Sequence, residues 1–295
     1  MCGIVALIGS REAAPQLLEG LRQLEYRGYD SAGIATIEAG GSGGAGGHLH
    51  CLKAEGKLVN LTARFDAQGA PGHCGIGHTR WATHGEPNDR NAHPHYSQHG
   101  KFAIIHNGII ENYASIKTEL QKRGHEFRSD TDTEVLVHLI EDIHENGDVS
   151  LDEAVRLALG EVIGAYAIVI LSEDHPNQLI CARKGSPIVL GVGKDKGEYF
   201  VASDATPIIE YTNNVIYLND GELAVVKNGE LTVKTIENQV KTPYIQELEM
   251  QLEQLEKGGF EHFMLKEIYE QPRSIWDSMR GRIDADKGFL RLGGI

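Results

Sequence analysis

The feature of this 295-residue sequence that most constrains its fold is a series of ten short apolar runs of the β-strand type. Several runs are apolar at consecutive positions, as expected of strands that are covered on both faces. Strands in series, with helical segments grouped between them, predict two packed sheets with helices outside rather than strict alternation of strand and helix. The predicted strands are Ile4–Ile8, Gly33–Ile37, Gly75–Trp81, Phe102–His106, Ala165–Leu171, Gln178–Ala182, Ile188–Val192, Tyr199–Ala202, Val215–Leu218 and Glu222–Val226.

Helices are indicated by apolar residues that recur every three or four positions and so share one helix face. Three such stripes occur, the third weaker than the others: Leu17, Leu18, Leu21 and Leu24; Val135, Leu136, Leu139 and Ile140; Ala154, Leu157 and Leu159.

Residues 40–47 form a glycine tract, GGSGGAGG, which has little side chain to bury and much backbone entropy to lose. Such a tract is either a phosphate-binding loop or a flexible hairpin tip between strands near Ala35 and Leu52. We favour the hairpin, because no helix start with Lys or Ser/Thr follows the glycines.

The charge balance excludes several partners. With 28 basic and 42 acidic residues the formal net charge is −14, which argues against binding to nucleic acid or to anionic lipid. The apolar run at 4–8 is too short for a signal-peptide core, and no run approaches the roughly 18 apolar residues of a membrane span. We therefore expect a cytoplasmic protein. The scattered cysteines predict neither a disulfide framework nor a thiolate zinc site, and we expect Cys51, Cys74 and Cys181 to be inert.

The character of the chain changes at Pro243. Apolar residues then recur at helical spacing among acids and glutamines until Gly258-Gly259, which predicts an amphipathic connecting helix. Residues 260–295 carry several large apolar side chains but are too few to build a core of their own.

The first residues, Met1-Cys2-Gly3-Ile4, suggest chemistry. If Met1 is trimmed, Cys2 carries both a thiol and a free α-amine. A thiol with a pKa of about 8.5 needs a nearby base, and an α-amine with a pKa of about 7.7–8.0 can act as one at cellular pH. The alternative is that Cys2 is only the second residue of a buried strand.

Three polar loops offer binding groups, and two of them follow apolar runs, where such groups usually lie. His78–Gly85 contains Arg80, whose guanidinium suits a carboxylate. In 106–108, Asn107 and Gly108 offer either two donors for a developing oxyanion or a common hairpin turn. Ser129–Glu134 precedes a helix and is either an N-cap with acids in the first turn or a site whose acid accepts an ammonium group.

Histidines gather between residues 78 and 99 and raise the question of a metal site. We predict none, because their spacing matches no zinc pattern and no helix carries an H-E-x-x-H motif. The histidines are His78, His84, His93, His95 and His99.

Six segments, taken together and in order, resemble the glutamine amidotransferase half of the glucosamine-6-phosphate synthase family. The resemblance covers residues 1–240, and the tail from Lys266 resembles the entry into that family's sugar-isomerising half. Related enzymes of purine and asparagine synthesis share the N-terminal cysteine but differ at the Tyr26-Arg27 and Arg80-Trp81 motifs. The six segments are Met1–Val5, Leu24–Gly33, His78–Gly85, Asn91–His95, His106–Asn112 and Thr131–Glu134.

The resemblance implies an α+β fold of the N-terminal-nucleophile hydrolase type, a four-layer αββα sandwich of two mainly antiparallel sheets. It implies that residues 1–240 form a glutaminase domain and that 241–295 hold a linker helix and the truncated start of the isomerase half. It implies no cofactor and no metal. Fructose 6-phosphate would be a partner only through the missing isomerase half, and the full-length enzyme would be a homo-oligomer.

The resemblance also implies a role for each site residue. Cys2 would attack the glutamine side-chain amide, with its own α-amine acting as the base directly or through water. Asn107 and Gly108 would hold the oxyanion. Glutamine itself would be bound through its α-carboxylate by Arg80, Thr83 and His84, and through its α-ammonium by Asp132. Arg27 and Gly28 would order the cysteine, and Trp81 would gate the released ammonia.

Two departures from the family limit this comparison. The glycine tract has the look of an unusually long insertion, and the isomerase half does not follow Ile295, so we expect the sequence to be an excised piece. Two other functions remain open: a purine-type amidotransferase half, and a non-catalytic glutamine-binding module.

Overall fold

The computed structural model describes residues 2–40, 46–83, 85–248, 259–279, 283–284 and 289–290. The chain divides into two compact units, Met1–Leu248 and Glu249–Ile295, so the first unit extends past the expected boundary at residue 240. None of the helices in these ranges is both long enough and apolar enough to cross a membrane.

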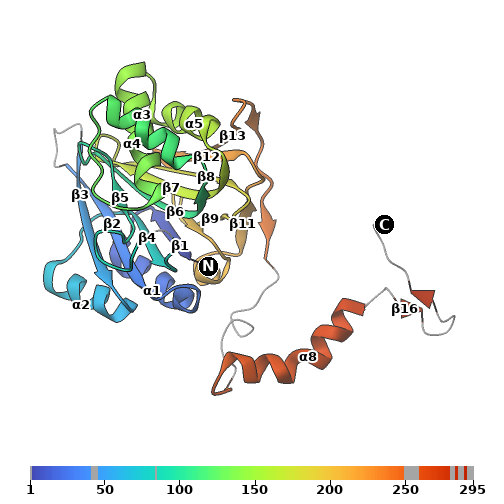
Figure 1. The fold of residues 1–295 in the computed structure, drawn as a ribbon. Coiled ribbons are helices and arrows are strands. Elements are labelled where there is room, and N and C mark those ends of the chain that lie inside the picture. Colours follow the sequence, from blue (N-terminus) through green and yellow to red (C-terminus); the bar gives the residue numbers. More distant parts are fainter. Residues whose placement is uncertain are drawn as a thin grey trace. The chain divides into compact units, whose positions relative to one another are not determined.

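Two sheets, both built from antiparallel strand pairs, form the first unit (Figure 1). The first sheet has the order β15-β11-β9-β10-β1-β4-β2-β3, and the second has the order β14-β13-β12-β8-β7-β6-β5. In the first sheet the strands are β1 (Gly3–Ile8), β2 (Ser31–Ala39), β3 (Gly47–Glu55), β4 (Cys74–Arg80), β9 (Val189–Val192), β10 (Tyr199–Ala202), β11 (Asn214–Tyr217) and β15 (Gln246–Glu247). In the second they are β5 (His95–Tyr96), β6 (Phe102–Ile110), β7 (Gly164–Ser172), β8 (Gln178–Lys184), β12 (Glu222–Lys227), β13 (Glu230–Thr235) and β14 (Val240–Lys241).

Strand β1 shows why the runs are apolar at consecutive positions. Ile4, Ala6 and Ile8 point into the core between the two sheets. Val5 and Leu7 point the other way, into the core beneath the helices of the first sheet. Because successive side chains of a strand alternate between faces, both faces of β1 are buried, as its sequence predicts.

Helices cover the outer face of each sheet (Figure 1). On the first sheet lie α1 (Ala13–Leu24) and α2 (Leu58–Gln68), and on the second lie α4 (Asp132–Gly147) and α5 (Leu151–Glu161), with α3 (Tyr113–Lys122) against α4. The short α6 (Thr206–Ile209) and a 3₁₀ turn at Glu25–Arg27 complete this unit. Three apolar layers thus separate four layers of structure, which confirms the predicted αββα sandwich.

The predicted helix stripes hold, with one exception. All four leucines of the first stripe are buried in α1. In α5, however, Leu157 is 37% exposed, so its place in the third stripe was wrong. The buried face of α5 is the one that repeats every 3.6 residues through Leu151, Ala154, Val155, Ala158 and Leu159, and Leu157 lies beside it.

The glycine tract joins β2 to β3, which pair along their whole length from Ser31↔Glu55 to Ala39↔Gly47. This antiparallel pairing confirms the predicted hairpin. Residues 41–45, at its tip, lie outside the described residues.

The predicted connecting helix does not begin at Pro243. Gln246 and Glu247 instead form β15, which pairs with β11 at the edge of the first sheet, and Leu248 N–H donates to Asn213 O at 2.7 Å. An edge strand with unpaired backbone groups provides these hydrogen bonds, and they outweigh the helical spacing of the side chains. The rest of the predicted helix, 249–258, lies outside the described residues.

The second unit contains α8 (Phe263–Met279) and the strand pair β16 (Ile283–Asp284) and β17 (Phe289–Leu290). Among its side chains that the structure describes, only Lys266 is buried. Phe263, Met264, Ile268 and Tyr269 are each at least half exposed. The described part of this segment therefore has no apolar core, as its length predicts.

Candidate active site

Elements of both sheets meet at a cavity of about 330 Å³, a size suited to a small molecule. Cys2 directly precedes β1, and Arg80 ends the neighbouring strand β4 of the same sheet. Asn107 lies on β6 of the other sheet, and Asp132 begins α4. Eight of the residues predicted for the site line this cavity: Cys2, Arg27, Arg80, Trp81, Thr83, Asn107, Gly108 and Asp132.

The Cys2 thiol is held against the backbone at the end of β4. Trp81 N–H donates to Cys2 Sγ at 3.2 Å, and Sγ lies 3.5 Å from Trp81 O. Burial raises the pKa of the Cys2 thiol, and the Trp81 hydrogen bond and the Arg80 charge offset this only in part. Near neutral pH the group is therefore mostly a thiol, and it needs a base to become a nucleophile.

Gly28 is required by a close approach of the backbone. A Cβ on Gly28 would lie 2.7 Å from Arg80 C and 2.9 Å from Trp81 N. Any side chain there would displace the peptide group that donates to Cys2 Sγ. Gly28 itself does not line the cavity, so it acts through that peptide.

Two acidic residues that the sequence reading did not assign hold the loops around the thiol. Asp30 Oδ2 accepts Ala82 N–H at 2.8 Å. Asp204 Oδ2 lies 3.3 Å from Arg27 Nη1. Asp30 belongs to the predicted Leu24–Gly33 motif and could have been found there, whereas no local signal marks Asp204.

Asn107 and Gly108 lie inside the continuous strand β6, so the hairpin-turn interpretation of this Asn-Gly pair was wrong. Asn107 Nδ2 donates to Cys2 O at 3.1 Å. Gly108 has φ = +136°, and a Cβ there would lie 2.0 Å from Ala165 O. Only glycine fits this position without pushing β6 away from β7.

Groups of opposite charge face the same cavity. The Arg80 guanidinium donates to Glu86 O at 3.4 Å and to Gly85 O at 3.2 Å, which anchors it at the cavity wall. Burial lowers the pKa of Arg80, while Asp30 and Asp132 are among the charges that raise it. A cation and a carboxylate in one cavity match the two charges of an amino acid.

The helix start at 131–134 forms the predicted N-cap and also places an acid at the cavity. Thr131 is the N-cap of α4, and its side chain accepts Glu134 N–H. Asp132, next in the chain, is almost fully buried, and its Oδ2 accepts Ile110 N–H at 2.8 Å. The cap therefore fixes the direction in which Asp132 enters the cavity.

Two further residues of the predicted site are Trp81 and His84. Trp81 is 46% exposed and packs edge-on against Tyr29, with ring centroids 5.7 Å apart. His84 lies outside the described residues. Ser186 and Pro187 also line the cavity, and sequence reasoning missed them because nothing around them resembles a motif.

The buried histidines form a layer at the cavity, which His93 lines and His78 and His95 do not. His78 stacks on His93 with centroids 4.2 Å apart, and His95 packs edge-on against His93. Burial lowers the pKa of His78 to about 3 and holds the pKa of His93 and His95 well below the usual value. These rings are therefore neutral.

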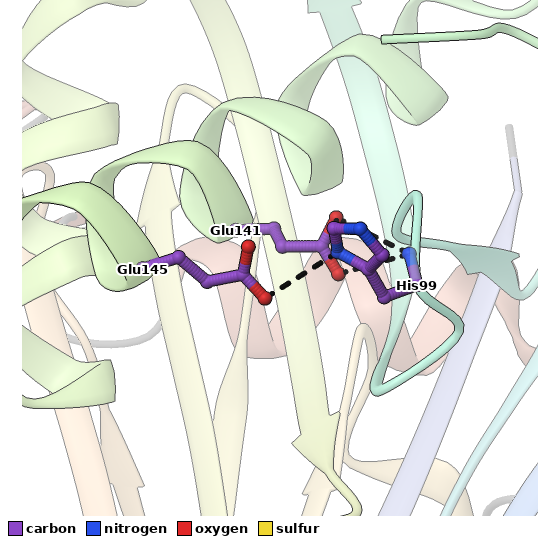
Figure 2. Close-up of side chains that lie close together, drawn as sticks. All are labelled: His99, Glu141 and Glu145. Atoms are coloured by element: carbon purple, nitrogen blue, oxygen red, sulfur yellow. Dashed lines mark hydrogen bonds and ion pairs between the residues drawn. The ribbon is translucent and has the colours of Figure 1, made fainter. Parts of the chain in front are cut away.

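Within the described ranges, only one group of three side chains places its donor atoms close enough together to hold a metal ion: His99, Glu141 and Glu145, all within 4.8 Å (Figure 2). None of the three lines the cavity. His99 Nδ1 lies 3.5 Å from Glu141 Oε2 and 3.4 Å from Glu145 Oε1, so an ion pair accounts for the same geometry.

Comparison with solved structures defines the class of protein. The chain superposes on the glutamine phosphoribosylpyrophosphate amidotransferase of B. subtilis with a TM-score of 0.67 and 26% identity, over 80% of this chain and 49% of that one. A structure described as the allosteric regulatory enzyme of purine biosynthesis gives 0.66 and 28% over the same shares. The αββα sandwich is thus the N-terminal-nucleophile fold of amidotransferases.

Sequence comparison defines the family. Residues 65–241 match the glutamine amidotransferase domain, and the chain belongs to this family. It is 54% identical to the glutamine–fructose-6-phosphate aminotransferases (isomerizing) of Chlorobaculum tepidum and Bacteroides thetaiotaomicron, over its whole length in each case. It spans only 47% of the length of either relative.

Proposed function

We propose that this chain hydrolyses the side-chain amide of glutamine to glutamate and ammonia, with Cys2 as the nucleophile. The observation that carries the proposal is the convergence of a thiol, an amide donor, a guanidinium and a carboxylate on one cavity of about 330 Å³. A free amino acid with an amide side chain matches each of these four groups.

Substrate binding uses the two charged ends of glutamine. The guanidinium of Arg80 binds the α-carboxylate, supported by Thr83 and His84, and Asp132 binds the α-ammonium. These contacts place the amide carbon beside Cys2 Sγ. Binding and chemistry are thereby divided between different side chains.

In the first step the Cys2 thiol gives its proton to its own α-amine, and the sulfur bonds to the amide carbon. Asn107 and Gly108 stabilise the negative oxygen that results. The C–N bond then breaks, and the nitrogen leaves as ammonia with the proton from the amine. In the second step water attacks the thioester, releases glutamate and restores the thiol.

In the longer relatives, we propose, the ammonia aminates fructose 6-phosphate on a second half, with Trp81 gating its passage. Homo-oligomer formation and a cytoplasmic location remain predictions for the full-length protein. A purine-type half is less well supported, since identity is 54% to the first group of relatives and 26–28% to the purine enzymes. A non-catalytic glutamine-binding module would bind glutamine without releasing ammonia.

The decisive experiment measures ammonia release from glutamine by protein whose N-terminus is defined by intact-mass measurement. Protein lacking Met1 should be active, and protein retaining it should lose nearly all activity, because an acylated nitrogen is no base. Cys2→Ala should be inactive, while Cys51→Ala, which removes another partly buried thiol, should keep wild-type turnover. Equal turnover with and without Met1 would disprove that Cys2 supplies both the nucleophile and the base.

A further inference from the structure

The side-chain amide of Asn107 is held at both ends. Its Nδ2 donates to Cys2 O at 3.1 Å, and its Oδ1 lies 2.9 Å from His78 Nε2. His78 belongs to β4 of the first sheet and Asn107 to β6 of the second, so this hydrogen bond joins the two sheets behind the cavity.

The protonation state of His78 follows from its neighbours. Nε2 faces two acceptors, Asn107 Oδ1 and the carbonyl oxygen of His106 at 3.2 Å, so Nε2 carries the hydrogen. Nδ1 is buried and has no hydrogen-bond partner among the described residues. Burial lowers the pKa of His78 to about 3, so the ring stays neutral and donates from Nε2 alone.

We propose that His78 is a positioning residue for amide hydrolysis, which fixes the Asn107 side chain with its NH₂ group toward the reacting carbonyl. This inference rests on the proposed function. An amide can rotate by 180° and exchange its oxygen and nitrogen with little change in shape. The rotated form would direct Oδ1 at the developing oxyanion, and two oxygens bearing negative charge repel each other. The Nε2–H group of His78 favours the productive form, because it can donate to Oδ1 of Asn107 but not to the NH₂ group.

The surroundings of His78 keep its ring in place. The ring stacks on His93 at 4.2 Å with an interplanar angle of 13°. His93 Nδ1 in turn accepts His106 N–H at 3.2 Å, which ties the stack to β6. With only 1% of its surface exposed, His78 does not reach the solvent, and it does not line the cavity. It therefore acts through Asn107 and does not touch the substrate.

Two substitutions of His78 test whether the hydrogen-bond donor must lie at the position of Nε2. In His78→Gln the amide nitrogen is as many bonds from Cα as Nε2 is, so it can still donate to Asn107 Oδ1. In His78→Asn the nitrogen takes the place of Nδ1 and cannot. We expect kcat for glutamine hydrolysis to fall about 10–100-fold in His78→Asn, with KM within about threefold, and to fall less than about fivefold in His78→Gln.

A double variant tests whether His78 acts through Asn107. Once Asn107→Ala has removed the amide, adding His78→Asn should change kcat by less than about twofold, because residues that act as a unit are not additive. A further 10-fold loss in the double variant would overturn the proposal and point to a general structural role. Alkylation of Cys2 and the melting temperature serve as controls for an intact nucleophile and fold.

Failure of a variant to fold and failure of the proposed function have different tests. If His78→Asn does not fold, the test is the kcat of His78→Gln. A loss of kcat in His78→Gln as large as that in Asn107→Ala would overturn the proposal. If wild-type protein releases no ammonia from glutamine, the proposed function fails. The orientation of the amide is then still read from the Asn107 NH₂ resonances in the NMR spectrum, which must shift in His78→Asn and stay close to wild type in His78→Gln. If the Asn107 NH₂ resonances are unchanged in His78→Asn, this result alone would overturn the positioning role of His78.

Discussion

At the scale of single residues, the proposed mechanism gives Asn107 and Arg80 different contributions to the same reaction. Asn107 would stabilise charge only after the amide carbon has been attacked, whereas Arg80 would bind a carboxylate that is present throughout. Asn107→Ala should therefore lower kcat by about 10²–10³-fold with little change in KM. Arg80→Ala should mainly raise KM. Steady-state kinetics of the two variants check this, and an effect of Asn107→Ala on KM alone would remove it from the oxyanion role.

Gly108 gives a second prediction at this scale. Gly108→Ala should lower kcat by about 10²-fold and destabilise the protein, because its Cβ would lie 2.0 Å from Ala165 O. Gly124→Ala is the matched control, since Gly124 also has a positive φ, +94°, but has no atom within 4 Å of the added carbon. The control should cost about 1 kcal/mol of stability from backbone strain and leave kcat unchanged. Equal kcat values for the two variants would contradict this explanation.

The sequence was most informative at this scale, and its failures have a physical cause. The presence of Cys2, Arg80 and Asn107 at one cavity could be predicted because each lies in a local polar motif beside an apolar run. The proposed role of His78 could not, because it depends on an atom of Asn107 in another sheet, 29 positions away. Pocket residues such as Ser186 are brought in by the fold alone.

At the scale of elements, the central strands of the two sheets were well predicted from the sequence, and strands at or near the sheet edges were not. A strand such as β7, with Ala167 and Val169 in the core between the sheets and Ile168 in the core under the helices, is apolar at every position from 167 to 171. Strand β13 has one buried apolar side chain, Val233, and its neighbours are polar, including the buried Lys234, so its sequence resembles a loop. Strand β15 is decided by a partner strand, so side-chain spacing gives no warning of it.

The buried histidines predict acid sensitivity of the folded protein. Burial lowers the pKa of His78 and His138 to about 3 from the ordinary value of 6.5. Between these values the unfolded chain binds protons that the folded chain does not, so stability is complete above pH 6.5 and falls as the pH falls toward 3. Each such histidine should contribute a slope of about 1.4 kcal/mol per pH unit.

Denaturant unfolding between pH 7.5 and pH 5 measures this slope. The control is His138→Phe, because His138 lies away from the cavity lining and stacks on Phe127 at 4.7 Å. This variant should reduce the slope by about 1.4 kcal/mol per pH unit, the contribution of one histidine that no longer takes up a proton. A free energy of unfolding that is flat across this range would show that the histidines are not held neutral.

At the scale of the whole molecule, the first unit should work alone. Every described residue assigned a catalytic or binding role lies before residue 133, so protein ending at 242 should retain most glutamine hydrolysis. Protein ending at 248 keeps the β15–β11 pairing and should be the more stable of the two by about 1–2 kcal/mol, as expected for a few backbone hydrogen bonds. Ammonia release and melting curves of 1–242, 1–248 and 1–295 test both statements. Loss of activity in 1–248, with its circular dichroism unchanged, would mean that the second unit contributes to the site.

The placement of the site across both sheets has a consequence for how the protein can evolve. Cys2 and Arg80 are attached to one sheet, and Asn107 and Asp132 to the other sheet and its helix. The separation between Cys2 and Asn107, the proposed nucleophile and oxyanion donor, therefore depends on the thickness of the apolar core between the two sheets. A substitution such as a larger side chain at Ala103 or Ala167 would change that thickness without touching any reacting group. Selection on turnover must then act on the interior of the sandwich as well as on its cavity.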